Sequence, residues 1–226
     1  MTVAMPAHTR LFNRVPSVTL EFWFIKLMAV TMGETAADYL AVTTFGPAVD
    51  AELVVARVRA VHERVKGTAR DGRSYSAGDP HLLRWVHICE VESFLAAHRV
   101  YGAEPLTRAE ADAYVADMAI VAERLGVNHA PRTVSELRAE FREYRPELRG
   151  TPEAREAARF LLVDPPLPLV ARGPYTVLGA AAVALLPMWA RWPLRLPYLP
   201  VTERLVARPA GDALTRLIRW SLSPVA

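Results

Sequence analysis

The chain has 226 residues, of which 52% are hydrophobic and 23% are charged. This balance is typical of a globular protein with a buried core, and it excludes an intrinsically disordered chain. The formal net charge is +3, but basic residues do not cluster with interleaved aromatic residues, so the composition does not indicate nucleic-acid binding. The single cysteine, Cys89, excludes an internal disulfide and any metal site built from several cysteines, and it favours a cytoplasmic location.

Two apolar stretches raise the question of a membrane. Residues 18–32 are interrupted by Glu21 and Lys26, and residues 175–190 contain Pro187. Both fall short of the roughly 20 uninterrupted apolar residues that a spanning helix needs, so we expect buried or interfacial helices. Residues 165–226 carry seven arginines against Glu203 and Asp212. This basic part could contact a membrane surface, although a solvated face is the simpler expectation.

Helix signals recur along the chain, and runs of alternating β-branched residues do not occur, which predicts an all-α fold. Thr107 and Thr133 are each followed three residues later by glutamate, the capping-box pattern that begins a helix. We expect helices over about 47–66 and 80–101 and others beginning near residues 108, 134, 152 and 174, with a loop over 67–80.

The segment 80–101 is apolar nearly all round, so we expect it to be the central helix. At 100° per residue, one face carries Leu83, His87, Val91, Phe94, His98 and Tyr101. A histidine at the centre of such a face is desolvated, which favours the neutral imidazole that a metal ion binds. The alternative is a core histidine that is hydrogen-bonded to a carbonyl. His98 lies roughly 16 Å along the helix from His87, so the two cannot bind one ion.

The preceding predicted helix carries Arg59 and His62, three residues apart on one side. A cation beside a potential ligand suits an anion-binding or oxygen-activating pocket, whereas a surface pair is the simpler interpretation. The sequence contains no HExxH motif, no Glu-x-x-His pair, no glycine-rich phosphate loop and no GxSxG elbow. Isolated histidines with a prosthetic group suit haem, because the porphyrin supplies four iron ligands and one histidine suffices.

Residues 57–101 resemble the central signature of the MpaB-type oxygenase family, which includes the latex-clearing rubber oxygenases. The resemblance depends on the Arg-x-x-His of Arg59 and His62, the loop that follows that helix, and the Trp-Val-His that ends at His87. The later stretches LGVNHAPRTVSELRAEF, TPEAREAARFLL and ALLPMWAR are also similar in order and spacing, so the resemblance covers about residues 45–226.

This resemblance implies an all-α protein that binds haem b and uses dioxygen to cleave a carbon–carbon double bond in an apolar, isoprenoid-like substrate. It implies that His87 is the proximal iron ligand and that Arg59 and His62 lie on the distal side, where rubber oxygenases use a lysine for ligation.

Residues 1–44 resemble instead the opening helix of a family of small bacterial multi-helix membrane proteins. We therefore expect a foreign apolar helical segment over 1–44 and an N-terminally truncated oxygenase-like domain over 45–226. Two alternatives stay open. One is a catalytically inactive, membrane-associated helical protein that arose from a fusion, and the other is a non-haem metal enzyme that uses His62 and His87 together.

Overall fold

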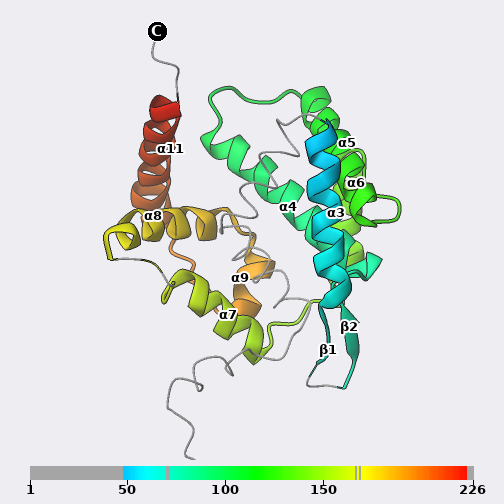
Figure 1. The fold of residues 1–226 in the computed structure, drawn as a ribbon. Coiled ribbons are helices and arrows are strands. Elements are labelled where there is room, and N and C mark those ends of the chain that lie inside the picture. The colour runs from blue at the N-terminus through cyan, green and yellow to red at the C-terminus, as the bar shows by residue number, and fades with distance from the viewer. Residues whose placement is uncertain (1–47, 70–71, 166, 168, 223–226) are drawn as a thin grey trace, which may run out of the picture.

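The computed structural model describes residues 48–69, 72–165, 167 and 169–222, and helices account for most of this part of the chain (Figure 1). The expectation of an all-α fold is confirmed. The segment predicted over residues 1–44 lies outside the described residues. In chain order the elements are α3 (Ala48–Arg64), β1 (Lys66–Thr68), β2 (Ser74–Ser76), α4 (Pro80–Tyr101), α5 (Arg108–Leu125), α6 (Val134–Tyr144), α7 (Pro152–Leu162), α8 (Leu169–Leu185), α9 (Met188–Leu194), α10 (Pro200–Thr202), the π-helical turn η2 (Glu203–Ala207) and α11 (Arg208–Leu222).

Helix α4 is the central element, as the sequence predicts. It packs against α5 and α6 on one side and against α8 and α11 on the other (Figure 1). The main core forms where apolar side chains of α4 meet those of α5 and α6, and four of its members are almost completely buried: Ile88, Val91, Val115 and Leu137. Burying four such side chains contributes about 1.5–3 kcal/mol each, so the pairing of α4 with α5 and α6 anchors the fold.

The capping signals place the start of α4 and α5 correctly. The Asp79 carboxylate accepts a hydrogen bond from the His81 backbone N–H, and Pro80 fills the first turn. Thr107 and Glu110 form a complete capping box at α5, and Gly126 ends that helix with a φ of 112°. Only glycine adopts such a left-handed conformation without steric cost, which explains why the helix stops there.

Three local predictions need correction. The loop expected over 67–80 contains a short antiparallel hairpin, in which Gly67 faces Tyr75. A side chain at Gly67 would collide with the Tyr75 ring, so glycine is what allows this pairing. Because the hairpin begins at Lys66, α3 ends at Arg64 instead of continuing to Lys66. Helix α8 begins at Leu169, so Pro174 lies inside it and costs one backbone hydrogen bond near its start.

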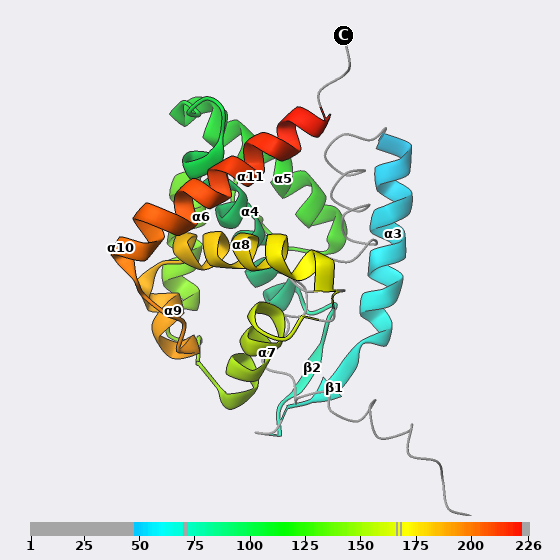
Figure 2. The ribbon, with the colours of Figure 1, turned by 90° about the vertical axis from the view of Figure 1, so that its left-hand side faces the viewer.

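The C-terminal third forms a second group of packed helices. Helix α8 lies against η2 and α11, and α7 contacts α9 (Figure 2). The regular structure over 200–222 is absent from the sequence-based prediction, which treats this part only as a basic tail.

Among the described residues, no single helix has the length and hydropathy of a bilayer span. The segments Ala171–Leu185 and Met188–Leu194 meet these criteria only as a pair, and they are bent by 120° relative to each other.

Candidate functional site

His87 lies on the buried side of α4, in the middle of the helix. Only 6% of the residue is exposed, and burial lowers the pKa of the imidazole from 6.5 to about 4. The ring is therefore neutral at physiological pH, which is the form that binds a metal ion. Its Nε2 atom is buried and has no hydrogen-bond partner among the described residues. The alternative of a core histidine hydrogen-bonded to a carbonyl therefore finds no support at Nε2 in this part of the structure.

His87 lies on the α4 face that the sequence predicts, but only the N-terminal half of that face is buried. Leu83, one turn before His87, packs against Ala119 and Ala122 of α5, and Val91, one turn after, belongs to the main core. Phe94 and His98, further along the same face, are exposed. His87 is consequently the histidine of this face that is removed from water, and His98 is not.

Glu90 is a partly buried carboxyl group that the sequence analysis missed. It lies one helical turn after His87, and its Oε1 atom is buried without a hydrogen-bond partner in the described part of the chain. Burial raises the pKa of Glu90 to about 7. Burial and, to a smaller extent, the negative charge of Glu90 raise the pKa of Tyr114 on α5. The spacing His-x-x-Glu, which puts both groups on one side of a helix, is the signal that could have found it.

His62 is half-buried on α3. Burial lowers the pKa of its imidazole, and its Nδ1 atom is buried with no hydrogen-bond partner among the residues described. It therefore shares with His87 the two properties of a potential ligand, namely a neutral ring and an uncommitted nitrogen.

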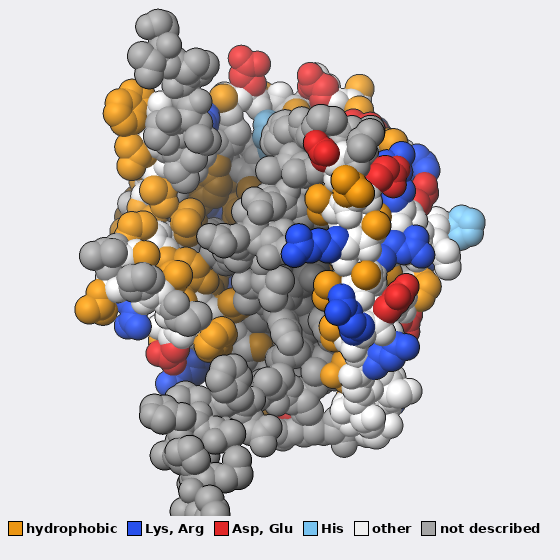
Figure 3. All heavy atoms as spheres, in the orientation of Figure 1, with side chains coloured by type: hydrophobic (Ala, Val, Ile, Leu, Met, Phe, Trp, Pro, Cys, Tyr) orange, Lys and Arg blue, Asp and Glu red, His pale blue; other side chains and the backbone are white. Residues whose placement is uncertain are grey.

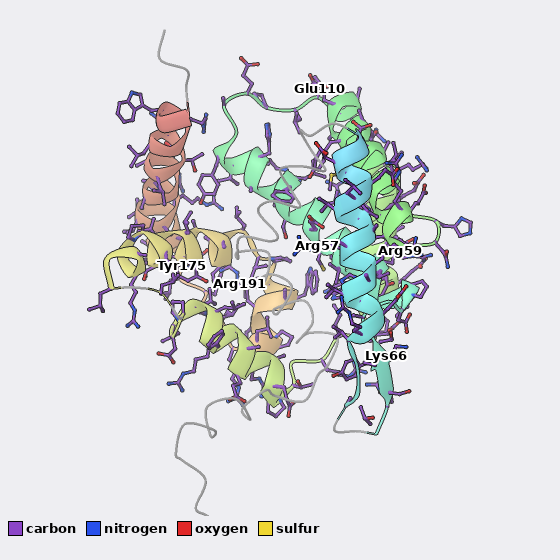
Figure 4. All side chains as sticks on the ribbon, viewed as in Figure 1. Arg57, Arg59, Lys66, Glu110, Tyr175 and Arg191 are labelled. Carbon is purple, nitrogen blue, oxygen red and sulfur yellow. The ribbon has the colours of Figure 1, made fainter. Side chains whose placement is uncertain are left out.

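Arg59 is exposed and faces α5. Its Nη1 donates a hydrogen bond of 3.2 Å to the backbone carbonyl of Arg124 at the end of that helix. Arg124 in turn pairs with Glu52 of α3 at 2.6 Å, so two polar contacts join α3 to α5. Arg57, two residues before Arg59, lies on the opposite side of α3 (Figure 4).

The structure places the three predicted residues on two helices that both pack against α5. Contacts between α3 and α4 themselves are fewer than those that each makes with α5. No group of three or more His, Cys, Asp or Glu side chains in the described ranges could hold a metal ion. The alternative of a non-haem site at His62 and His87 therefore finds no third protein ligand in this part of the chain.

Two of the surface hollows that described residues form are lined by none of Arg59, His62 and His87. One, of about 630 Å³, lies beside His98, Arg99 and the start of α5. The other, of about 470 Å³, lies between Met188, Trp192 and Tyr198 near the C-terminal helices. We place the candidate site at His87 nonetheless, because its imidazole is buried and neutral and its Nε2 atom has no partner among the residues described.

The donor set at His87 fits a haem better than a bare metal ion. A free ion needs three or four protein ligands, whereas the porphyrin supplies four and leaves one axial position to the protein. His87 meets the requirement for that one protein ligand, because it is buried on a helix among apolar side chains and its Nε2 has no partner in the described part of the chain. The residues present are thus compatible with haem ligation by His87.

Comparison with known proteins assigns the chain to a class. The profile of the family described as "ER-bound oxygenase mpaB/B'/Rubber oxygenase, catalytic domain" matches residues 31–220. The match begins within residues 1–44, the segment for which we expect a different origin, and the boundary near residue 45 stays a prediction.

Two curated relatives are similar over a shorter range. Uncharacterized proteins of Mycobacterium tuberculosis and Mycobacterium bovis are each 41% identical over 93 residues. This alignment covers 41% of the present chain and 34% of each relative, so the chain matches about a third of their length. No solved structure matches the chain. Because the family profile covers most of the sequence, the chain belongs to the mpaB and rubber oxygenase catalytic-domain family.

Proposed function

We propose that this protein is a haem-dependent oxygenase that cleaves a carbon–carbon double bond in an apolar, isoprenoid-like substrate with dioxygen. Membership of the family supports an oxygenase. The observation that carries the haem proposal is His87, which is buried and neutral and has an Nε2 atom without a protein partner among the described residues.

The reaction balances without a further reductant. Both atoms of one dioxygen molecule are added to the two carbons of the double bond, and two carbonyl groups result. Haem b, when bound, supplies the iron centre at which dioxygen is activated. His87 would hold the iron through Nε2, and the apolar side chains around α4 would exclude water from that side.

The two residues proposed for the distal side differ in how well they suit that role. His62 has a neutral ring and a buried Nδ1 without a partner among the described residues, so it is able to accept or donate a proton near a bound group. Arg59 carries the permanent positive charge that would stabilise a developing anion. In this structure, however, its guanidinium is bonded to the Arg124 carbonyl, and it would have to leave that contact to act.

Turnover by the haem-loaded protein tests the proposal. We expect a soluble isoprenoid oligomer to yield aldehyde or ketone products with matching oxygen consumption. His87→Ala should remove this activity, whereas His98→Ala, which changes an exposed histidine of the same helix, should keep it. Haem-loaded protein that forms no product from such oligomers would favour the inactive, membrane-associated alternative. Equal activity in the His87 and His98 variants would refute the assignment of His87.

A further inference from the structure

The C-terminal helical segment from Pro200 to Leu222 exposes an apolar row along its length. The row begins with Val201 on α10 and continues with Leu205 and Val206 on η2. It ends with Leu217 and Trp220 near the end of α11. All five are more than half exposed, and Trp220 is 75% exposed. Hydrophobic side chains gather at the left side of the molecule in Figure 3, where Figure 1 places α8 and α11. We call this set of five residues the C-terminal apolar row.

The π-helical turn η2 keeps this row in line. A wider turn contains one residue more than an α-helical turn, so it shifts the residues before it relative to those after it. With that shift, Val201 and Leu205 fall on the same side as Leu217 and Trp220, which are themselves three residues apart on α11. The opposite side of the segment is buried, because Ala207 and Gly211 face the protein, and a side chain at Gly211 would collide with the Tyr101 ring.

Arginines border the apolar row on one side. Arg204 and Arg208 are four residues apart and lie on adjoining turns. Arg219 lies about three turns further along, and its Nη2 donates a hydrogen bond to the Tyr101 carbonyl. Arg216 is also exposed and pairs with Asp212 at 2.8 Å. The other carboxylate of this segment, Glu203, is bound to the buried Arg191 and does not offset the surface charge. The exposed face thus combines aliphatic and tryptophan side chains with a positively charged border.

We propose that this face docks on a membrane surface that carries anionic lipids. An interfacial helix with an apolar row and bordering arginines inserts its apolar side chains at the boundary of head groups and acyl chains, while the guanidinium groups bind phosphates. A second copy of the chain is the less suitable occupant, because a symmetric contact would bring one arginine border against the other.

This docking surface does not depend on haem or on the oxygenase reaction, so the two proposals are tested separately. The experiment is sedimentation of the full chain with phosphatidylcholine vesicles, with and without about a third of phosphatidylglycerol. We expect the chain to bind the anionic vesicles. Each arginine near the surface should contribute about fivefold to the affinity, and added salt should weaken binding because it screens this attraction.

Variants assign the binding to this face. Leu217→Ser and Trp220→Ser should each reduce vesicle affinity by about tenfold, since each removes a large apolar group from the interface. Leu53→Ser is the matched control, because Leu53 is a similarly exposed leucine on α3, and it should leave binding unchanged. Circular dichroism verifies that each variant keeps its helices.

Three results would overturn the proposal. One is equal binding to neutral and anionic vesicles or no binding to either. Another is equal vesicle affinity of Leu217→Ser, Trp220→Ser and the unaltered chain, which would show that a different segment binds the membrane. The third is a dimer in solution that Leu217→Ser dissociates, which would show that a second copy covers the face.

Discussion

The buried guanidinium of Arg191 donates two hydrogen bonds to the carboxylate of Glu203, one of 2.6 Å from Nη1 and one of 3.3 Å from Nη2. Arg191 lies on α9 and is only 3% exposed, and its Nε donates to the Leu186 carbonyl as well. One side chain therefore joins the end of α8, helix α9 and the π-helical turn. This contact fixes the base of the C-terminal segment that exposes the apolar row.

Removing the carboxylate should destabilise the protein strongly. In Glu203→Ala the charge of Arg191 would stay buried without its partner, so we expect a loss of about 3 kcal/mol in the free energy of unfolding by urea. Asp212→Ala, which breaks the exposed pair with Arg216, is the control and should cost less than about 1 kcal/mol. Similar losses in both variants would contradict a special role for the buried pair.

The pair of Arg191 and Glu203 should also make the folding stability depend on pH in the acid range. The hydrogen bond from Arg191 holds the pKa of Glu203 below its usual value. The folded chain therefore gains stability above the carboxyl's usual pKa and loses it as the pH falls through the lowered value. Glu203→Ala and the double variant Glu203→Ala, Arg191→Met both lack this carboxylate. The difference between their free energies of unfolding should therefore not show this acid-dependent loss.

The two predicted capping boxes differ, and a double-mutant cycle should show it. At α5 the Glu110 carboxylate accepts from the Thr107 N–H at 2.7 Å, whereas at α6 the Glu136 carboxylate accepts from the N–H of Arg132 and not of Thr133. Alanine substitutions of Thr107 and Glu110 should show a coupling energy of about 0.5 kcal/mol or more. The same cycle at Thr133 and Glu136 should give a value near zero. Equal coupling energies at the two helices would contradict this reading of the caps.

Glu90 should make the protein less stable as the pH rises. Burial raises its pKa from 4.5 to about 7, so between these values the unfolded chain has already lost the proton that the folded chain keeps. Stability attributable to this group therefore falls across that window. Glu90→Gln should match the unaltered chain near pH 4.5 and exceed it by up to about 3 kcal/mol near pH 7, measured by urea unfolding. A difference that stays constant with pH would show that Glu90 is ionised normally.

Arg59 offers a test that separates turnover from folding. Its visible contact is one exposed hydrogen bond to the Arg124 carbonyl, so Arg59→Ala should lower the melting temperature by only a few degrees. If the guanidinium stabilises charge during the reaction, oxygen consumption should fall by about one to three orders of magnitude. A fall in melting temperature of ten degrees or more would identify Arg59 as a structural link between α3 and α5.

The sequence predicts the helices best where capping and periodicity agree. Asp79 with Pro80 and Thr107 with Glu110 place two helix starts correctly, because these contacts are local. The hairpin is missed because Gly67 and Tyr75 pair across a turn whose residues read as a loop. The helical segment after Pro200 is missed because its buried side is small, with Ala207 and Gly211 as its packing residues.

The candidate site is predictable in part for the same reason. The burial of His87 follows from the periodicity of one helix, which the sequence contains in full. The contact of Arg59 with the carbonyl of Arg124 joins positions 65 residues apart, and no local pattern specifies it. The raised pKa of Glu90 likewise depends on how α4 packs against other helices.

Titration with hemin tests the central claim most directly. At one equivalent, the unaltered protein should shift the Soret band away from that of free hemin, and His87→Ala should abolish the shift. The controls are His98→Ala and His129→Ala, which change exposed histidines on α4 and in the loop after α5, and both should preserve the shift. Added imidazole should restore the band in His87→Ala, because a free ligand is able to occupy the vacated axial position. Circular dichroism of that variant should stay unchanged. A spectrum of the unaltered protein identical to that of free hemin, or a normal Soret shift in folded His87→Ala, would contradict the assignment of His87 as the haem ligand.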